Sequence, residues 1–190
     1  MASKEIKRKT YRSRRLVIRP LKLADFETWL RSQELAKPSR GKFDADSLPL
    51  ERRTRANFNK AVRRQQRQAR NDSVYVWNVF LKKTGELIGH LDINPIAREP
   101  YQMANLGYRI LNNYWGQGYA TEAVRSLVSH AFKDLSLHRF EAVIDLDNKA
   151  SIALAKACGL HREGIKKHYW YQNNRWEDQV VYIATPELFR

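Results

Sequence analysis

The strongest constraint on the fold of this chain is a glycine-containing turn between a strand-like and a helix-like segment. Residues 103–111 favour a strand, and residues 120–135 place alanine and leucine on one helical face. Between them runs Asn-Asn-Tyr-Trp-Gly-Gln-Gly, a sequence typical of a turn. Residues 139–145 then resemble a buried strand. A strand, loop, helix and strand in this order indicate a sheet with helices packed on it.

Segments on both sides of this unit extend the pattern. Residues 73–81 are rich in Val, Tyr, Trp and Phe, and a turn at 82–86 joins them to an alternating segment at 87–94, which predicts an antiparallel hairpin. The other predicted elements are strands at 16–21, 160–171 and 178–185, helices at 24–33, 50–70 and 148–159, and a loop at 37–49. The fold class is therefore predicted as α/β or α+β, with a mixed, mostly antiparallel sheet and helices on both faces.

A chain of 190 residues is long enough for one domain with a sizeable core. We expect a single domain over 1–190, in which residues 1–15 form a basic N-terminal extension. The longest uncharged apolar stretch, about 74–81, is too short to cross a membrane, so we expect a soluble, cytoplasmic protein. The one cysteine, Cys158, cannot form an intramolecular disulfide, and the five histidines lack metal-ligand spacing, so no metal site is expected.

Positive charge is concentrated in the first part of the chain. The net charge is +15, and residues 1–70 hold 21 Lys and Arg against 7 Asp and Glu. Such a balance predicts that basic residues within 4–70 contact a polyanionic surface such as the ribosome, although the same residues could equally form a solvated surface. No RNA-binding motif is present, so any nucleic-acid contact would be directed at phosphates. The charges form two clusters: Lys4, Lys7, Arg8, Lys9, Arg12, Arg14 and Arg15, then Arg52, Arg53, Arg55, Lys60, Arg63, Arg64, Arg67 and Arg70.

The turn Gly116-Gln117-Gly118 is a candidate anion site. Glycines let the backbone approach a ligand, and the first N–H groups of the following helix are free to bind an anion. A tight turn also requires glycine for conformational reasons, so this pattern alone is weak. A P-loop is excluded because no Gly-Lys-Ser or Gly-Lys-Thr is present, and Thr121 stands where a dinucleotide fingerprint needs a small residue.

The surrounding sequence resembles the GNAT acetyltransferases and, within them, the RimJ/RimL group that acetylates the N-terminal amine of ribosomal proteins. The resemblance is carried by LGYRILNNYWGQGYATEAVRSLVSHAF from Leu106, by DNKAS from Asp147, by CGLHREG from Cys158 and by a late aspartate, Asp178. It extends from about Tyr11 to Phe189 and is strongest between 106 and 164.

This resemblance implies acetyl-CoA as the acetyl donor and a sheet that splays to admit the thioester. Asn148 would bind the pantetheine, Ser151 would protonate the departing thiolate, and an amide between Leu106 and Tyr108 would polarise the acetyl carbonyl. Without the resemblance, Asn148 equally suits a helix N-cap and Ser151 a hydroxyl in the first helical turn. The pantetheine arm would pair with Tyr108, Arg109 and Ile110, and the pyrophosphate would be held by amides of Trp115, Gly116, Gln117, Gly118, Tyr119, Ala120 and Thr121.

The chain departs from the family where a base or an acid is common. Asparagines stand at 105 and 113, and Ala155 replaces a frequent acid tyrosine, which leaves Ser151 as the proton donor. Three residues remain as candidates for the base, with nothing in the spacing to choose between them: His90, Asp92 and Glu99. A weak base suits an N-terminal α-amine, whose pKa near 8 leaves about a tenth of it neutral at pH 7.

We therefore predict an N-acetyltransferase that transfers acetyl directly to a primary amine, favouring the α-amine of a ribosomal or other protein. Cys158 precedes a predicted C-cap glycine, Gly159, so a covalent acyl-enzyme is not expected. Two alternatives remain open, an acetyltransferase for a polyamine or aminoglycoside and a non-catalytic GNAT-like module that binds RNA or the ribosome. The oligomeric state is left open.

Overall fold

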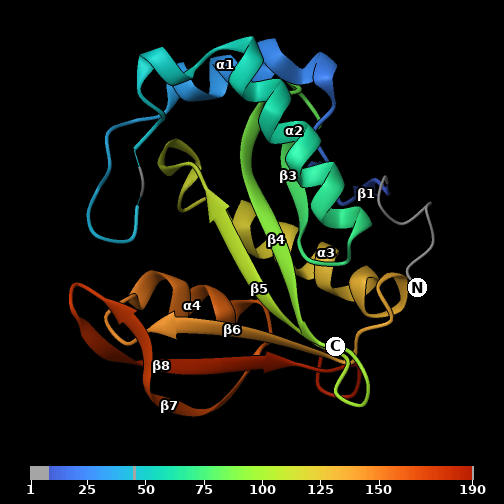
Figure 1. The fold of residues 1–190 in the computed structure, drawn as a ribbon, viewed down its shortest axis with the longest axis vertical. Helices are drawn as coiled ribbons and strands as arrows, with labels where there is room; N and C mark the ends of the chain where they lie inside the picture. The colour runs from blue at the N-terminus through green and yellow to red at the C-terminus, as the bar shows by residue number, and fades with distance from the viewer. Residues whose placement is uncertain (1–8, 45, 190) are drawn as a thin grey trace.

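The structure is a computed structural model that describes residues 9–44 and 46–189. Within these residues, eight strands form one sheet in the order β1-β2-β3-β4-β5-β6-β8-β7 (Figure 1). Neighbouring strands run antiparallel except β5 and β6, which run parallel. The predicted mixed, mostly antiparallel sheet is confirmed.

Most strands lie close to the predicted segments; buried and more exposed residues alternate in β2 and in the first half of β5, whereas β3 and the second half of β8 are buried over consecutive residues. The turn between the last two strands is made by Asn173 and Asn174, whose φ angles of 51° and 59° suit a type I′ hairpin. The bounds are β1 Tyr11–Arg12, β2 Leu16–Arg19, β3 Tyr75–Leu81, β4 Leu87–Ala97, β5 Met103–Ile110, β6 Arg139–Asp145, β7 His161–Gln172 and β8 Arg175–Ala184.

Helices cover both faces of the sheet, as predicted (Figure 1). The main core lies between the sheet and two helices, α3 (Tyr119–Asp134) and α4 (Lys149–Ala157). On the other face, α1 (Phe26–Leu35) and α2 (Arg55–Arg70) pack on a smaller apolar cluster. None of the described helices combines the length and apolarity that a membrane span requires.

Phe58 is expected to contribute most to the attachment of α2. Its ring is 1% exposed and lies 5.6 Å from Phe26 and 5.1 Å from Trp29 of α1, measured between ring centroids. Phe58→Ala should lower the free energy of unfolding by about 3 kcal/mol, because it removes the ring and leaves a cavity. Urea denaturation measures this, with the exposed Leu50→Ala as a control that should change stability by less than about 0.5 kcal/mol.

The start of the described chain is packed on the domain. Tyr11 is buried in the main core, and its hydroxyl donates to Asp134 at the end of α3 at 2.7 Å. Lys9 forms an ion pair with the same carboxylate at 2.6 Å. Part of the predicted basic extension therefore belongs to the packed structure, while Lys4, Lys7 and Arg8 lie outside the described residues.

The predicted basic helix begins later than the pattern indicated. Residues 50–52 form a short 3-10 turn, and α2 starts after Thr54, whose side-chain oxygen accepts a hydrogen bond from the Asn57 amide at 3.2 Å. This N-cap satisfies a free amide at the helix start. Phe58 and Val62 face the sheet, so the narrow apolar stripe of this helix was predicted correctly.

Candidate active site

The parallel strands β5 and β6 pair over only part of their length. Met103 lies opposite Arg139 and Asn105 opposite Glu141, and the described pairing ends there although both strands continue. In Figure 1 the two strands diverge beyond this point. The edge of β5 from residue 106 onward therefore has backbone groups available to a ligand that lies beside it as an added strand would.

The glycine turn follows the open end of β5. Gly116 and Gly118 have φ angles of 76° and 75°, a conformation that glycine adopts without strain, and Gly118 is the N-cap of α3. Among the described residues, no carbonyl accepts a hydrogen bond from the amides of 116–121. Trp115, Gly116, Gln117 and Gly118 are exposed, whereas Tyr119, Ala120 and Thr121 are half-buried. Exposed, unpartnered amides at a helix N-terminus form an anion-binding site.

Arg15 supports this turn from the N-terminal segment. Its guanidinium binds the Glu122 carboxylate at 2.7 Å, donates to the Gln117 carbonyl at 3.0 Å and lies 4.3 Å from the centre of the Tyr119 ring. Although burial opposes ionisation of Glu122, hydrogen bonds from Arg15 and from Ser13 hold the pKa of its carboxyl below the ordinary value. The guanidinium of Arg15 thus lies beside the anion site, although Arg15 is more than 100 positions away from the turn in the sequence.

The side chains of Tyr108 and Ser151 meet between the diverging strand β5 and the start of α4. Their hydroxyl oxygens are 2.9 Å apart. Asn148 is the N-cap of α4, and its side-chain oxygen accepts a hydrogen bond from the Ser151 amide at 3.1 Å. Burial raises the pKa of Tyr108 to about 12, so its hydroxyl keeps its proton at neutral pH.

The next two residues of β5 are placed differently. Arg109 faces the α1–α2 side of the sheet, with its guanidinium 3.9 Å from the Asp44 carboxylate. The side chain of Ile110 is buried in the main core, and its carbonyl accepts a hydrogen bond from the Trp115 indole at 2.6 Å. This bond holds Trp115 against the end of β5 and occupies a backbone acceptor that the family resemblance assigned to the pantetheine.

A cavity of about 450 Å³ lies under α1 and α2, on the opposite face of the sheet from Ser151. Phe58 and Trp29 form part of its apolar wall, and its charged lining consists of Arg64, Arg109, Asp46 and Asp92. Asn78 is 6% exposed, and among the described residues its side-chain nitrogen has no hydrogen-bond partner. Buried donors are normally hydrogen-bonded, so this nitrogen is available to an acceptor on a ligand or a water in the cavity.

Two of the three candidate bases line this cavity. His90 and Asp92 project from β4 to the same face because they are two residues apart, whereas Glu99 is exposed in the following loop and does not line the cavity. Burial lowers the pKa of His90 below its ordinary value of 6.5; the charge of Asp92 opposes this shift and that of Arg109 adds to it, so the imidazole is neutral at pH 7. The tertiary structure thus distinguishes candidates that were equivalent in the sequence.

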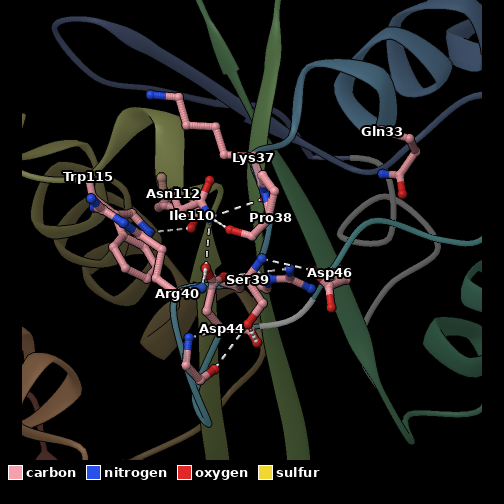
Figure 2. A network of polar contacts seen from close by, with 12 residues as sticks. Gln33, Lys37, Pro38, Ser39, Arg40, Asp44, Asp46, Ile110, Asn112 and Trp115 are labelled. Atoms are coloured by element: carbon pink, nitrogen blue, oxygen red, sulfur yellow. Dashed lines mark hydrogen bonds and ion pairs between the residues drawn. The ribbon is translucent and has the colours of Figure 1, made fainter.

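A loop connecting α1 to α2 extends along the open ends of β5 and β6. Figure 2 shows Asn112, just after β5, with its side-chain nitrogen donating to the carbonyls of Lys37 and Pro38 and to the Asp44 carboxylate, at 3.2, 2.9 and 2.8 Å. Lys42 forms an ion pair at 3.0 Å with Asp145, the last residue of β6. This loop therefore contacts both strands that border the gap.

The sequence model of the family described as Acetyltransferase (GNAT) domain matches residues 15–161 of this chain. These residues include the glycine turn, the diverging strands and the start of α4. The chain belongs to the GNAT acetyltransferases. YoaA of Bacillus subtilis (strain 168), an uncharacterized N-acetyltransferase, is 36% identical to this GNAT protein over 106 residues, which are 56% of this chain and 59% of YoaA.

Relatives of this GNAT protein include ribosomal-protein acetyltransferases. The [Ribosomal protein uS5]-alanine N-acetyltransferase of Escherichia coli (strain K12) is 27% identical over 116 residues, 60% of each chain. The structure of Mycobacterium smegmatis RimJ in complex with CoA-disulfide is similar with a TM-score of 0.72 and 25% identity, covering 90% of this chain and 82% of that one. The chain spans about 60% of the length of the two curated relatives.

The two asparagines that distinguish this GNAT protein are placed differently: the Asn113 side chain has a hydrogen-bond partner, whereas the buried side-chain oxygen of Asn105 has none among the described residues. Asn113 donates to the Leu35 carbonyl at 2.6 Å, which attaches the end of α1. Asn105 lies opposite Glu141, which is 3% exposed and paired with Lys166 and Arg139 at 2.6 and 2.7 Å. Although burial opposes ionisation of Glu141, these cations hold the pKa of its carboxyl below the ordinary value, so it is a poor proton acceptor.

Two supports of the site were not found from the sequence, Arg15 and Asn112. Arg15 was grouped with a basic cluster, and Asn112 was one polar residue in a turn; neither residue type signals a contact more than 70 positions away. Cys158 is buried, and burial raises its pKa to about 12, so it stays a thiol at neutral pH and is a weak nucleophile.

Proposed function

We propose that this protein transfers the acetyl group of acetyl-CoA directly to a primary amine, and that the amine is the N-terminal α-amine of a protein. The gap between β5 and β6 carries this proposal. At one end lie the unpartnered amides of 116–121, and along it consecutive residues of β5 face opposite sides, Tyr108 towards Ser151 and Arg109 into the cavity. A ligand in the gap would therefore border both the hydroxyl pair and the cavity.

The residues present fit acetyl-CoA. The amides of 116–121, with the guanidinium of Arg15 beside them, would hold its pyrophosphate. Backbone groups of Tyr108 and Arg109 would pair with the pantetheine, since the Ile110 carbonyl already has a partner. Asn148 uses its side-chain oxygen to cap α4, and its nitrogen would donate to a pantetheine carbonyl.

Acetyl-CoA supplies an acetyl thioester that an amine can attack. A backbone amide between Leu106 and Tyr108 would hydrogen-bond the acetyl oxygen, where negative charge develops. The neutral imidazole of His90 would accept a proton from the amine at a ring nitrogen. The hydroxyl of Ser151 would donate to the departing sulfur, while the Tyr108 hydroxyl holds Ser151 in place.

The cavity supports a peptide acceptor over a polycation. Arg64 and Arg109 line it together with Asp46 and Asp92, so the charged lining is balanced and offers no excess of carboxylates to a polyamine or an aminoglycoside. The unpartnered nitrogen of Asn78 suits a carbonyl such as that of a first peptide bond. The name of the Escherichia coli relative supports a ribosomal protein as the acceptor. Such acceptors are made in the cytoplasm, where we expect the reaction to occur.

Ser151→Ala is expected to lower kcat about tenfold and to change the affinity for acetyl-CoA by less than about twofold. The hydroxyl would stabilise the departing thiolate. Because a thiol has a pKa of about 8.5, the thiolate leaves readily even without full protonation, and the expected effect is therefore moderate. Steady-state kinetics with calorimetric titration of acetyl-CoA measure both quantities, and Ser129→Ala, exposed on α3, is the matched control. An unchanged kcat would remove Ser151 from the reaction.

Mass spectrometry tests the function directly. The protein is incubated with acetyl-CoA and a pool of short peptides with free N-termini, ribosomal-protein N-terminal sequences, polyamines and aminoglycosides. We expect one acetyl group on the α-amine of a peptide, located by fragmentation. Acetylation of small amines alone would refute the proposed acceptor, and acetyl-CoA binding without any product would refute catalysis on this pool.

A further inference from the structure

The outer face of α2 carries a row of cations. Between Arg55 and Arg70 the helix contains six Lys and Arg and no Asp or Glu. Its buried residues, Phe58, Val62 and Ala69, lie on one side. At 100° per residue, Lys60, Arg63 and Arg67 lie on the opposite side, and all three are exposed. We define these three residues as the α2 cation row.

The cations of this row have no carboxylate partner within the described chain, unlike several basic residues earlier in it. No ion pair within the described residues involves Lys60, Arg63 or Arg67. Several other cations of the basic half are each paired with a carboxylate: Lys9 with Asp134, Arg15 with Glu122, Arg19 with Asp25, Lys42 with Asp145 and Arg55 with Glu27. Among the described residues of the basic segment 4–70, the α2 cation row therefore combines three exposed cations without a carboxylate partner on one face of one helix.

We propose that the α2 cation row binds the phosphate backbone of RNA. Lys60 and Arg67 are two helical turns apart, about 10 Å, a length over which one nucleic-acid strand presents about three phosphates. A membrane surface fits less well, because the apolar side of α2 is buried against the sheet and no apolar face remains for a bilayer.

The choice of RNA over DNA rests on the proposed function. A ribosomal-protein acceptor is held beside RNA, and α2 also contributes Phe58, Ala61 and Arg64 to the wall of the acceptor cavity. RNA bound on the outer side of this helix would therefore hold the enzyme with its cavity close to such an acceptor. The interaction is directed at phosphates, so it carries little sequence specificity.

The test compares two triple variants that each remove three positive charges. The first, Lys60→Gln with Arg63→Gln and Arg67→Gln, removes the α2 cation row. The second, Lys83→Gln with Lys156→Gln and Arg162→Gln, removes three exposed cations elsewhere and serves as the matched control. Fluorescence anisotropy with a labelled RNA hairpin is measured between about 50 and 200 mM salt.

We expect the first variant to bind RNA at least tenfold more weakly than wild type at about 0.1 M salt. The slope of log K for RNA binding against log salt concentration should become less steep by about two to three, while the control keeps the wild-type affinity and slope. Equal loss in both variants, or no loss in the first, would overturn the proposal. Tighter binding of wild type to a DNA duplex or to anionic vesicles than to RNA would overturn the choice of RNA.

Two further measurements separate this result from folding and from catalysis. Thermal unfolding of the first variant should match wild type, because the three side chains are exposed. Acetylation of a free peptide should also match wild type, since the α2 cation row does not line the cavity. RNA binding is measured without acetyl-CoA, so a failure of the proposed acetyl transfer would leave that result unchanged.

Discussion

Gly118→Val is expected to weaken acetyl-CoA binding by a factor of about 10² to 10⁴. Gly118 has a φ of 75°, which a β-branched residue adopts only with strain, so the turn must change conformation. The amides that follow it would then no longer converge on the pyrophosphate. Losing two hydrogen bonds to a charged group, at about 1.5–3 kcal/mol each, gives this factor. Isothermal titration calorimetry with CoA measures it.

Gly85→Val is the matched control for this prediction. Gly85 has a φ of 74°, and a Cβ there would meet no atom within 4 Å, so valine introduces similar strain in a turn away from the gap. We expect its stability to fall like that of Gly118→Val while its CoA affinity stays at the wild-type value. Wild-type affinity in Gly118→Val would show that the turn does not hold the pyrophosphate.

His90→Gln is expected to lower kcat/KM about 10²-fold at pH 7 and to leave CoA affinity unchanged. A positioned general base contributes about 10²–10⁴ to a rate, and the lower value suits an α-amine that is already partly neutral. The loss should be larger for a lysine side chain than for an α-amine, because the lysine amine holds its proton more tightly. His161→Gln, an exposed histidine outside the cavity, is the control and should keep the wild-type rate.

The pH profile gives an independent reading of His90. Burial lowers its pKa below 6.5, so the imidazole is deprotonated at neutral pH and gains a proton only in more acidic solution. Wild-type kcat/KM should therefore show an acid limb below about pH 6.5, and His90→Gln should lack it while keeping the rise towards pH 8 that comes from the amine. An acid limb retained in His90→Gln would assign it to another group, with Asp92 next to be replaced.

Much of the fold could be predicted from local sequence patterns. The strand at 139–145 matches β6 exactly in its bounds, and the helix that starts after Asn148 has the expected N-cap. Both depend on neighbouring residues, which alternate along a strand or cap a helix regardless of the rest of the chain. Strand β1 was missed because two residues carry no periodicity and pair only through contact with β2.

The candidate site was predictable to a different extent at each residue. The glycine turn has a positive φ at both glycines, a property that its own residues require, and it was found from the sequence. The Tyr108–Ser151 contact joins residues 43 positions apart, and only the family resemblance placed them in one site beforehand. The choice of His90 over Glu99 required the register of β4 and the packing of α1 and α2 above it.

The sequence by itself determined the strand and helix segments, the conformation of the glycine turn, the N-cap at Asn148 and the excess of positive charge. These follow from backbone preferences and from composition, which act over a few residues or over the whole chain. Only the tertiary structure decided that Arg15 lies beside the turn, which histidine enters the cavity, and which of the described cations pair with a carboxylate. Such contacts depend on the order and register of the strands, which bring together residues more than 100 positions apart.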